Sequence, residues 1–308
     1  MEKECYIDLH THTLFSDGKF NYYELVEEAE NYGIQYLGIT DHNYLMSIQE
    51  YEELQANFDN IIIIPGCEID CEYIFQSGKK VGIHIVVLYP CLYNNIQEMR
   101  DLLENYRKGN REKYIKKLIS NLKELGFNVG TYEELSKKYN YLGRAALANE
   151  MKFLGYVDTV NEANFNYLGN FGKRLALYDL PPKNMGEILS LDKVLDMAKK
   201  TYGISIVAHL NLYNLTESEE MELLEYVSKK AGMSGGLEVN YRGYDENLVN
   251  KLKNYSIKYN LFASCASDYH GYYETDSLDN QYEGTETYID LFSRWLVSYV
   301  VWFVWKVS

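Results

Sequence analysis

The stretch Asp8-Leu9-His10-Thr11-His12-Thr13-Leu14-Phe15-Ser16-Asp17-Gly18 decides how the rest of the chain is interpreted. The apolar, β-prone residues just before His10 predict a strand. On an extended chain, side chains two residues apart point to the same side, so His10 and His12 can hold one metal ion together. The Ser-Asp-Gly turn that follows lets the carboxylate of Asp17 reach back to the same place. An isolated His-x-His pair is more often two ordinary polar residues, so the interpretation depends on the remaining sequence.

Length, composition and charge limit the classes of protein to consider. The 308 residues fit one large α/β domain, or such a domain with an insertion, and a hydrophobic content of 46% allows a sizeable core. The net charge of −15 argues against a long nucleic acid as ligand, because neutralisation of phosphates by basic residues supplies most of that affinity. The charge does not argue against a small phosphorylated substrate that metal ions hold.

The termini and the cysteines predict a cytoplasmic protein that does not enter a membrane. Residues 1–5 lack the character of a signal peptide. The apolar stretch Trp295–Trp305 is far shorter than the roughly 20 residues of a membrane span, so we expect a terminal strand or helix packed on the body. The cysteines are odd in number and have no Cys-x-x-Cys spacing, so we interpret them as reduced core residues: Cys5, Cys67, Cys71, Cys91 and Cys265.

Short apolar strands alternate with helical patterns over much of the chain. Strands are predicted at residues 5–9, 35–42, 61–64, 80–88, 204–209, 236–240 and 261–271. Apolar residues at helical spacing predict helices at 21–32, 46–57, 190–200, 217–231 and 247–259. Repeated strand-then-helix units predict parallel strands with helices outside, and about seven units predict a closed or nearly closed barrel. In such barrels the chemistry collects at the carboxyl ends of the strands.

A helix-rich region interrupts this alternation. From residue 93 to residue 187 the pattern is mostly helical, with Glu, Lys and Arg on the polar faces. We therefore predict that residues 1–92 and 188–308 form the barrel. Residues 93–187 are expected to form an insertion that packs near its mouth.

All histidines of the chain fall at positions that suit one site. They are His10, His12, His42, His84, His209 and His270. All but His84 lie at the carboxyl end of a predicted strand or in the turn after it, and His84 lies inside an apolar strand. One histidine in a strand is more often a hydrogen-bonded core residue, but so many on one rim indicate a common role. With Asp17, Glu68 and Asp268 they form a set of N and O donors without sulfur, which suits Zn, Mn or Fe.

These residues lie in motifs that resemble those of a known family. The motifs are Asp-Leu-His-Thr-His-Thr with Ser-Asp-Gly, Gly-Ile-Thr-Asp-His, Gly-Cys-Glu-Ile, Ala-His and Ser-Asp-Tyr-His. In this order they resemble the PHP (polymerase and histidinol phosphatase) family over residues 6–272. The resemblance implies an α/β fold, a distorted (β/α)7 TIM-like barrel, with a helical insertion. It also implies a cluster of two or three divalent metal ions, Zn, Mn or Fe.

The resemblance further implies which residues hold which ion. The first ion would be held by His10, His12, Glu68 and Asp268. Glu68 would bridge to the second ion, which His84 and His209 also hold. The third would be held by Asp17, His42 and His270.

Within the family, the segment that begins at Gly143-Arg144 resembles the inserted region of the ribonuclease AM branch. That branch usually has Pro after the Arg, whereas Ala145 stands here. Arg144 is a candidate for binding a substrate phosphate, and its alternative is a surface salt bridge at the start of a helix. Asp41 is a candidate for proton transfer or for orienting a ligand imidazole. Asp17, Asp41 and Arg144 are the expected catalytic residues, and Glu238 is interpreted as structural.

The resemblance implies a metal-dependent phosphoesterase. We expect it to hydrolyse a phosphomonoester of a small metabolite, a nucleoside monophosphate or 3′,5′-bisphosphate, by attack of a hydroxide that bridges two ions. The alternatives are a histidinol-phosphate phosphatase and a 5′-3′ exonuclease on short RNA. A metal-loaded binding module is the alternative without catalysis, and the complete ligand set argues against it. The sequence leaves the general acid and the oligomeric state open.

Overall fold

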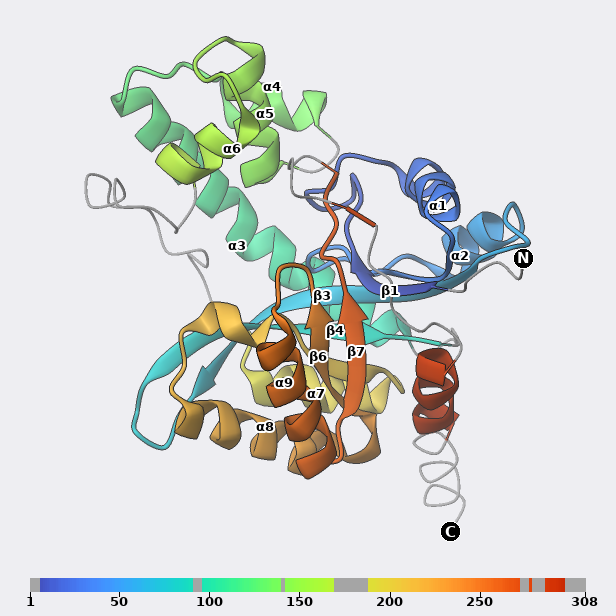
Figure 1. The fold of residues 1–308 in the computed structure, drawn as a ribbon. Helices are drawn as coiled ribbons and strands as arrows, with labels where there is room; N and C mark the ends of the chain where they lie inside the picture. The colour runs from blue at the N-terminus through green and yellow to red at the C-terminus, as the bar shows by residue number, and fades with distance from the viewer. Residues whose placement is uncertain are drawn as a thin grey trace.

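The computed structural model describes residues 6–90, 96–139, 142–168, 188–271, 277–278 and 286–296 (Figure 1). Within these residues, one sheet carries strands β1 to β7 side by side in chain order. Their bounds are Tyr6–Thr11 (β1), Ile34–Ile39 (β2), Ile62–Ile74 (β3), Lys80–Leu88 (β4), Ile204–Val207 (β5), Gly235–Tyr241 (β6) and Phe262–Ala266 (β7). These strands match the predicted ones apart from their bounds, and β3 is much longer than expected.

The sheet curls until its first strand meets its last. The amide of His12 donates to the carbonyl oxygen of Tyr269 at 2.9 Å, and the amide of Asp268 donates to the carbonyl oxygen of His10 at 2.9 Å. One apolar cluster joins β1, β3, β4, β5 and β7, with Leu9 and Phe262 among its buried members. Side chains of strands that lie at opposite ends of the sheet order can share a core only if the sheet is curved toward a barrel.

Strand β4 runs antiparallel to both of its neighbours, so the prediction of parallel strands throughout was wrong. The predicted strand at 61–64 does not end there, because β3 continues to Ile74. Only the short turn at residues 75–79 separates β3 from β4, and the amide of Phe75 donates to the carbonyl oxygen of Lys79 at 2.9 Å. A connection this short can join only antiparallel strands, since a parallel pair needs a crossover of a dozen residues or more.

Helices outside the sheet lie where helical spacing predicted them. Their bounds are Tyr22–Asn31 (α1), Ile48–Gln55 (α2), Leu191–Lys200 (α7), Glu217–Ala231 (α8) and Glu246–Lys258 (α9). Side chains of Asn21, Ser47 and Thr216 accept hydrogen bonds from the first helical turns of α1, α2 and α8. Such caps satisfy amides that have no partner inside the helix, which fixes where each helix begins.

The described part of the segment between β4 and α7 consists of helices joined by loops and turns. It comprises α3 (Gln97–Glu124), α4 (Tyr132–Lys138), α5 (Arg144–Phe153), α6 (Val160–Ala163) and the π-helix η2 (Asn164–Leu168). The second half of α3 packs with α4, α5, α6 and η2 in an apolar cluster of their own, whereas its first half adds Met99 and Leu103 to the barrel's core. Figure 1 shows α3 leading from the barrel to the group of α4, α5 and α6. We retain 93–187 as the proposed insertion, of which 93–95, 140–141 and 169–187 lie outside the described residues.

The C-terminal part contributes one further helix at residues 286–296. Its side chains Leu291 and Trp295 are buried in the core that β1 and β7 share. The rest of the apolar stretch Trp295–Trp305 lies mostly outside the described residues. No helix in the described ranges is both long and apolar enough to cross a membrane. Cys67, Cys71 and Cys265 are buried free thiols, and Cys5 and Cys91 lie outside the described residues.

Close approach of β1 and β2 requires a glycine at position 38. A Cβ atom added there would lie 2.5 Å from the carbonyl oxygen of Leu9, which is backbone and cannot rotate away. We expect Gly38→Ala to lower the free energy of unfolding by about 1–3 kcal/mol, the usual cost of overpacking. The urea midpoint measures this effect. Gly82→Ala on β4, where no atom lies within 4 Å of the added Cβ, is the matched control, and an equal loss in both variants would contradict the argument.

Candidate metal centre

The carboxylate of Glu68, almost completely buried, is the centre of the predicted site. Its Oε1 lies 2.6 Å from Nδ1 of His84 and 2.9 Å from Nε2 of His209. Its Oε2 lies 2.9 Å from Nδ1 of His42, and 3.4 Å from Nε2 of both His10 and His12. One carboxylate therefore touches imidazoles from four different places along the chain.

The predicted ligands gather into small groups around Glu68. In each group, one N or O atom per residue lies within 4.8 Å of the others. The groups are His10, His12 and Asp268; Glu68, His84 and His209; His12, Asp17, His42 and His270; and His42, Asp70 and His84. The structure thus brings together all predicted metal ligands, and the members of each implied set lie close to one another.

The distances between donors suit a small divalent cation. Nε2 of His10 and Nε2 of His12 are 3.1 Å apart, and Oδ1 of Asp268 lies 3.6 Å and 3.1 Å from them. Neighbouring donors in a tetrahedral site with bonds of about 2.0–2.1 Å are about 3.3 Å apart. The first group therefore has the spacing that a zinc-sized ion requires.

Several buried donor atoms at the centre have no hydrogen-bond partner. They are Asp17 Oδ1, His42 Nδ1, Glu68 Oε2 and His209 Nδ1. Buried polar atoms are normally paired, since an unpaired one costs about 1–3 kcal/mol. Of these atoms, His42 Nδ1 and Glu68 Oε2 lie 2.9 Å apart without forming a hydrogen bond, an arrangement that a cation satisfies, so these residues fit a metal cluster.

Burial and neighbouring charges shift the pKa values of this cluster in opposite directions. Burial lowers the pKa of His12 to about 3. Burial acts in the same direction on His84, but the carboxylates of Glu68 and Asp70 outweigh it and raise the pKa of His84 to about 9. For Glu68, burial opposes ionisation, yet the imidazoles of His42 and His84 hold its pKa well below the usual range. An ionised carboxylate among imidazoles is a donor set suited to divalent ions, whose binding displaces protons from histidines.

The backbone is left-handed at three positions beside the centre. Asn43, His209 and Asp268 have φ values of 51°, 30° and 54°, respectively. Each follows the end of a strand by two to four residues. Non-glycine residues adopt this conformation at a cost, and such strain gathers at functional sites, where the surrounding structure holds it.

Glu238 is not merely structural, which corrects the expectation from sequence. Its Oε1 lies 2.7 Å from Nδ1 of His10, and its Oε2 accepts from the amide of His209 at 2.6 Å. The carboxylate therefore fixes the ring of one predicted ligand and the backbone of another. This arrangement orients Nε2 of His10 toward Glu68 and His12, as carboxylates behind ligating histidines do.

Asp41 acts on the turn that carries the His-x-His motif. Its oxygens accept from the amide and the hydroxyl of Thr13, at 2.8 Å and 2.6 Å, and from the hydroxyl of Ser16. The Ser16 hydroxyl also lies 3.2 Å from Nδ1 of His12. With three donors on its two oxygens, Asp41 supports the orienting role, through Ser16, better than the transfer of a proton.

Asp70 is a site residue that sequence reasoning missed. Its Oδ1 lies 2.9 Å from Nε2 of His84, and its Oδ2 accepts from the amide nitrogen of Asn43 at 2.9 Å. Asp70 and Glu68 are two residues apart on β3, so they share one face of that strand. If the strand had been predicted to continue past residue 64, the alternation of side chains along a strand would have placed Asp70 on the same face as Glu68 and made it a candidate ligand.

Arg144 is a predicted site residue that does not contact the other predicted site residues in the described part of the chain. It begins α5 and is partly buried. Among the described residues, no hydrogen bond or ion pair links Arg144 to Glu68 or to the histidines around it. Its binding of a phosphate stays a prediction.

Comparisons with known proteins agree with this geometry. A family profile described as PHP domain matches residues 8–294. The 5′-3′ exoribonuclease of Haemophilus influenzae is 27% identical over 263 residues, 85% of this chain and 89% of the relative. The 5′-3′ exoribonuclease Rnm of Salmonella typhimurium is 25% identical over 266 residues, 85% and 84% of the two chains. A solved structure of a proposed metal-dependent phosphoesterase from Bifidobacterium adolescentis has a TM-score of 0.73 at 20% identity, and the match covers 94% of this chain and 96% of that one. The likeness confirms the predicted distorted TIM-like barrel.

Proposed function

Because the chain belongs to the PHP domain family and is a phosphoric ester hydrolase, we propose that it removes nucleotides from the 5′ end of short RNA. Two relatives carry the name 5′-3′ exoribonuclease, and each match covers most of this chain and most of the relative. The net charge of −15 favours short substrates, because the chain lacks the basic excess that a long duplex or strand requires.

The observation that carries the proposal is the buried Glu68 carboxylate within reach of five imidazoles. We propose that the cluster holds two or three divalent ions, Zn, Mn or Fe, with the ligand sets implied by the family resemblance. When bound, such ions supply positive charge to the phosphoryl oxygens and make a water more acidic, so that it becomes a nucleophile.

Residues behind the predicted ligands would fix the positions at which the divalent ions bind. Glu238 and Asp41 hold the rings of His10 and His12, the latter through Ser16, so that the donor atoms converge before substrate arrives. Three divalent ions would exceed the ligand carboxylates Asp17, Glu68 and Asp268 by about three positive charges. The site would then attract a phosphate although the whole chain is acidic.

A phosphomonoester of a single nucleotide is the second candidate substrate. A cavity of about 660 Å³ beside the centre favours it, since this volume is typical of sites for small molecules.

The buried thiols of Cys67, Cys71 and Cys265 agree with a reducing compartment, so we place the reaction in the cytoplasm.

The test compares three substrates under the same conditions. A short RNA with a labelled 5′-phosphate end, adenosine 3′,5′-bisphosphate and histidinol phosphate are each incubated with the enzyme and Mn²⁺. We expect release of 5′-mononucleotides from the RNA, loss of that release after chelation, and recovery when Mn²⁺ is returned. An intact RNA beside dephosphorylated bisphosphate would favour the second candidate. Hydrolysis that persists unchanged in the chelated sample would contradict the role of metals.

A further inference from the structure

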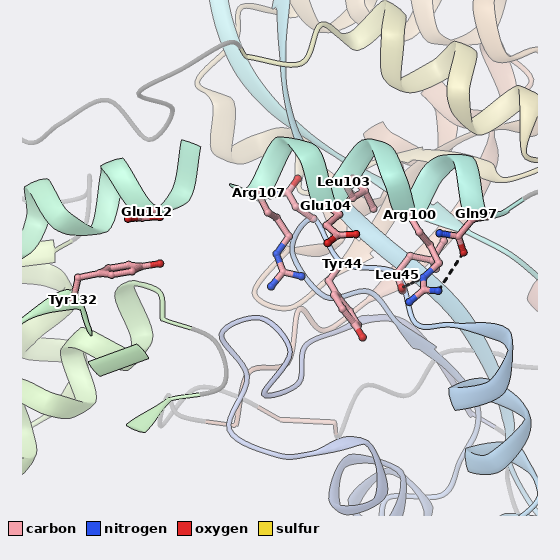
Figure 2. Close-up of a pocket in the computed structure, with 10 residues that line it drawn as sticks. Tyr44, Leu45, Gln97, Arg100, Leu103, Glu104, Arg107, Glu112 and Tyr132 are labelled. Carbon is pink, nitrogen blue, oxygen red and sulfur yellow. Dashed lines mark hydrogen bonds between the residues drawn. The ribbon is translucent and has the colours of Figure 1, made fainter. Parts of the chain in front are cut away.

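A cavity lies between the segment after β2 and the first half of α3 (Figure 2). Its volume is about 660 Å³. Residues 43–45 form one wall, and α3 forms the opposite wall with Arg100 and Arg107. Tyr132 and Glu112 line its far end.

Asn43 is the residue of the cavity wall that contacts the candidate metal centre. Asn43 lines the cavity and directly follows the predicted ligand His42. Its amide nitrogen donates to Asp70, which contacts His84, and its backbone amide donates to the carbonyl oxygen of Glu68 at 2.7 Å. The wall of the cavity thus begins one residue after a predicted metal ligand, which makes this cavity the candidate place for the group next to a phosphate at the centre.

The two arginines project from the same face of α3, two helical turns apart. The guanidinium of Arg107 lies 5.1 Å from the centre of the Tyr44 ring. The Tyr44 ring also stacks with Phe15, at 5.0 Å between the ring centres, and its hydroxyl donates to Glu50 at 3.0 Å. Nε of Arg100 donates to the carbonyl oxygen of Leu45 at 3.1 Å. Both guanidinium groups are thus fixed before any ligand binds, which lowers the entropy lost on binding.

Both positively and negatively charged side chains line the cavity, and this limits the chemical class of ligand that can bind. Glu104 lines the cavity beside the arginines and Glu112 lines its far end, so a free phosphate would meet negative as well as positive charge. A nucleoside offers hydroxyl and amino donors for the carboxylates, acceptors for the guanidinium groups and a flat ring that stacks on arginine or tyrosine. The volume of the cavity also exceeds what a phosphate alone would fill.

We propose that this cavity binds the nucleoside that carries the reacting phosphate, with Arg107 as the main specificity-determining side chain. The proposal rests on the proposed function, since it names the part of the substrate that lies beyond the scissile bond. It also predicts that the enzyme distinguishes nucleotides from other phosphate esters by KM.

The test compares a nucleotide with p-nitrophenyl phosphate, which has no nucleoside. With Mn²⁺ present, Arg107→Met is expected to raise KM for adenosine 3′,5′-bisphosphate or the short RNA about tenfold or more, the effect of one charge-assisted hydrogen bond. The kcat/KM for p-nitrophenyl phosphate should stay within about twofold of wild type, and this retained activity shows that the variant is folded. Arg107→Lys, which keeps the charge but loses the planar group, should lie in between. Lys117→Met removes an exposed cation of the same helix and is the matched control.

Two results would overturn the proposal. One is an unchanged KM for the nucleotide in Arg107→Met, and the other is a parallel loss for both substrates. If wild type hydrolyses p-nitrophenyl phosphate but neither nucleotide nor RNA, the proposed function fails while the cavity is still testable. Adenosine should then inhibit that hydrolysis competitively, and less so in Arg107→Met, whereas no inhibition would refute the cavity's role.

Discussion

Glu68→Gln is expected to reduce hydrolysis by on the order of 1000-fold, the upper end for loss of one electrostatic group at an active site. The substitution keeps the shape of the side chain and removes its charge. Because both oxygens of Glu68 face histidines, at 2.6–3.4 Å, the loss affects every group of the cluster. The measurements are kcat with saturating Mn²⁺ and the metal content of the purified variant, which should fall together.

Glu72→Gln is the matched control for this substitution. Glu72 lies four residues further along β3, and its carboxylate pairs with the ammonium of Lys80 at 3.6 Å, away from the histidines. Its loss should leave metal content and kcat unchanged. A Glu68→Gln variant that keeps its metals and hydrolyses at more than about a tenth of the wild-type rate would refute the central position of this carboxylate.

Glu238→Gln should weaken metal affinity by about 10–100-fold, the usual cost of losing a carboxylate that orients a ligating histidine. The variant loses the charge and one of the two acceptor oxygens, so it cannot accept from both Nδ1 of His10 and the amide of His209. Since the ligands themselves remain, excess Mn²⁺ should restore most of the hydrolysis in this variant but not in Glu68→Gln. Activity as a function of metal concentration separates the two roles.

Glu220→Gln provides the comparison for Glu238→Gln. Glu220 is also buried, but it contacts Lys251 and Tyr255 on α9 instead of a histidine. Its substitution should lower the melting temperature without changing the metal concentration at half-maximal activity. If excess Mn²⁺ does not rescue Glu238→Gln, the residue acts on more than the orientation of His10.

The sequence alone was sufficient to predict the barrel and the residues that meet at its rim. His10 and His12 follow directly from the period of two along a strand, and His42, His209 and His270 follow the ends of other strands. The carboxyl ends of parallel strands lie at one edge, so residue type and position relative to a strand were enough for these side chains. The helices were predictable for a similar local reason, since caps and apolar spacing are written in neighbouring residues.

Only the tertiary structure decided how His84, Asp70 and Glu238 take part. His84 lies in the middle of β4, and it reaches the cluster because β4 pairs antiparallel with the extended β3, opposite Asp70. Glu238 meets His10 across a separation of 228 residues, a contact that no local pattern records. The cavity beside Tyr44 forms likewise between a loop and a helix distant in sequence. Local sequence determines strand, helix and turn, whereas contacts between distant segments depend on register and strand direction, which are fixed only when the whole barrel packs.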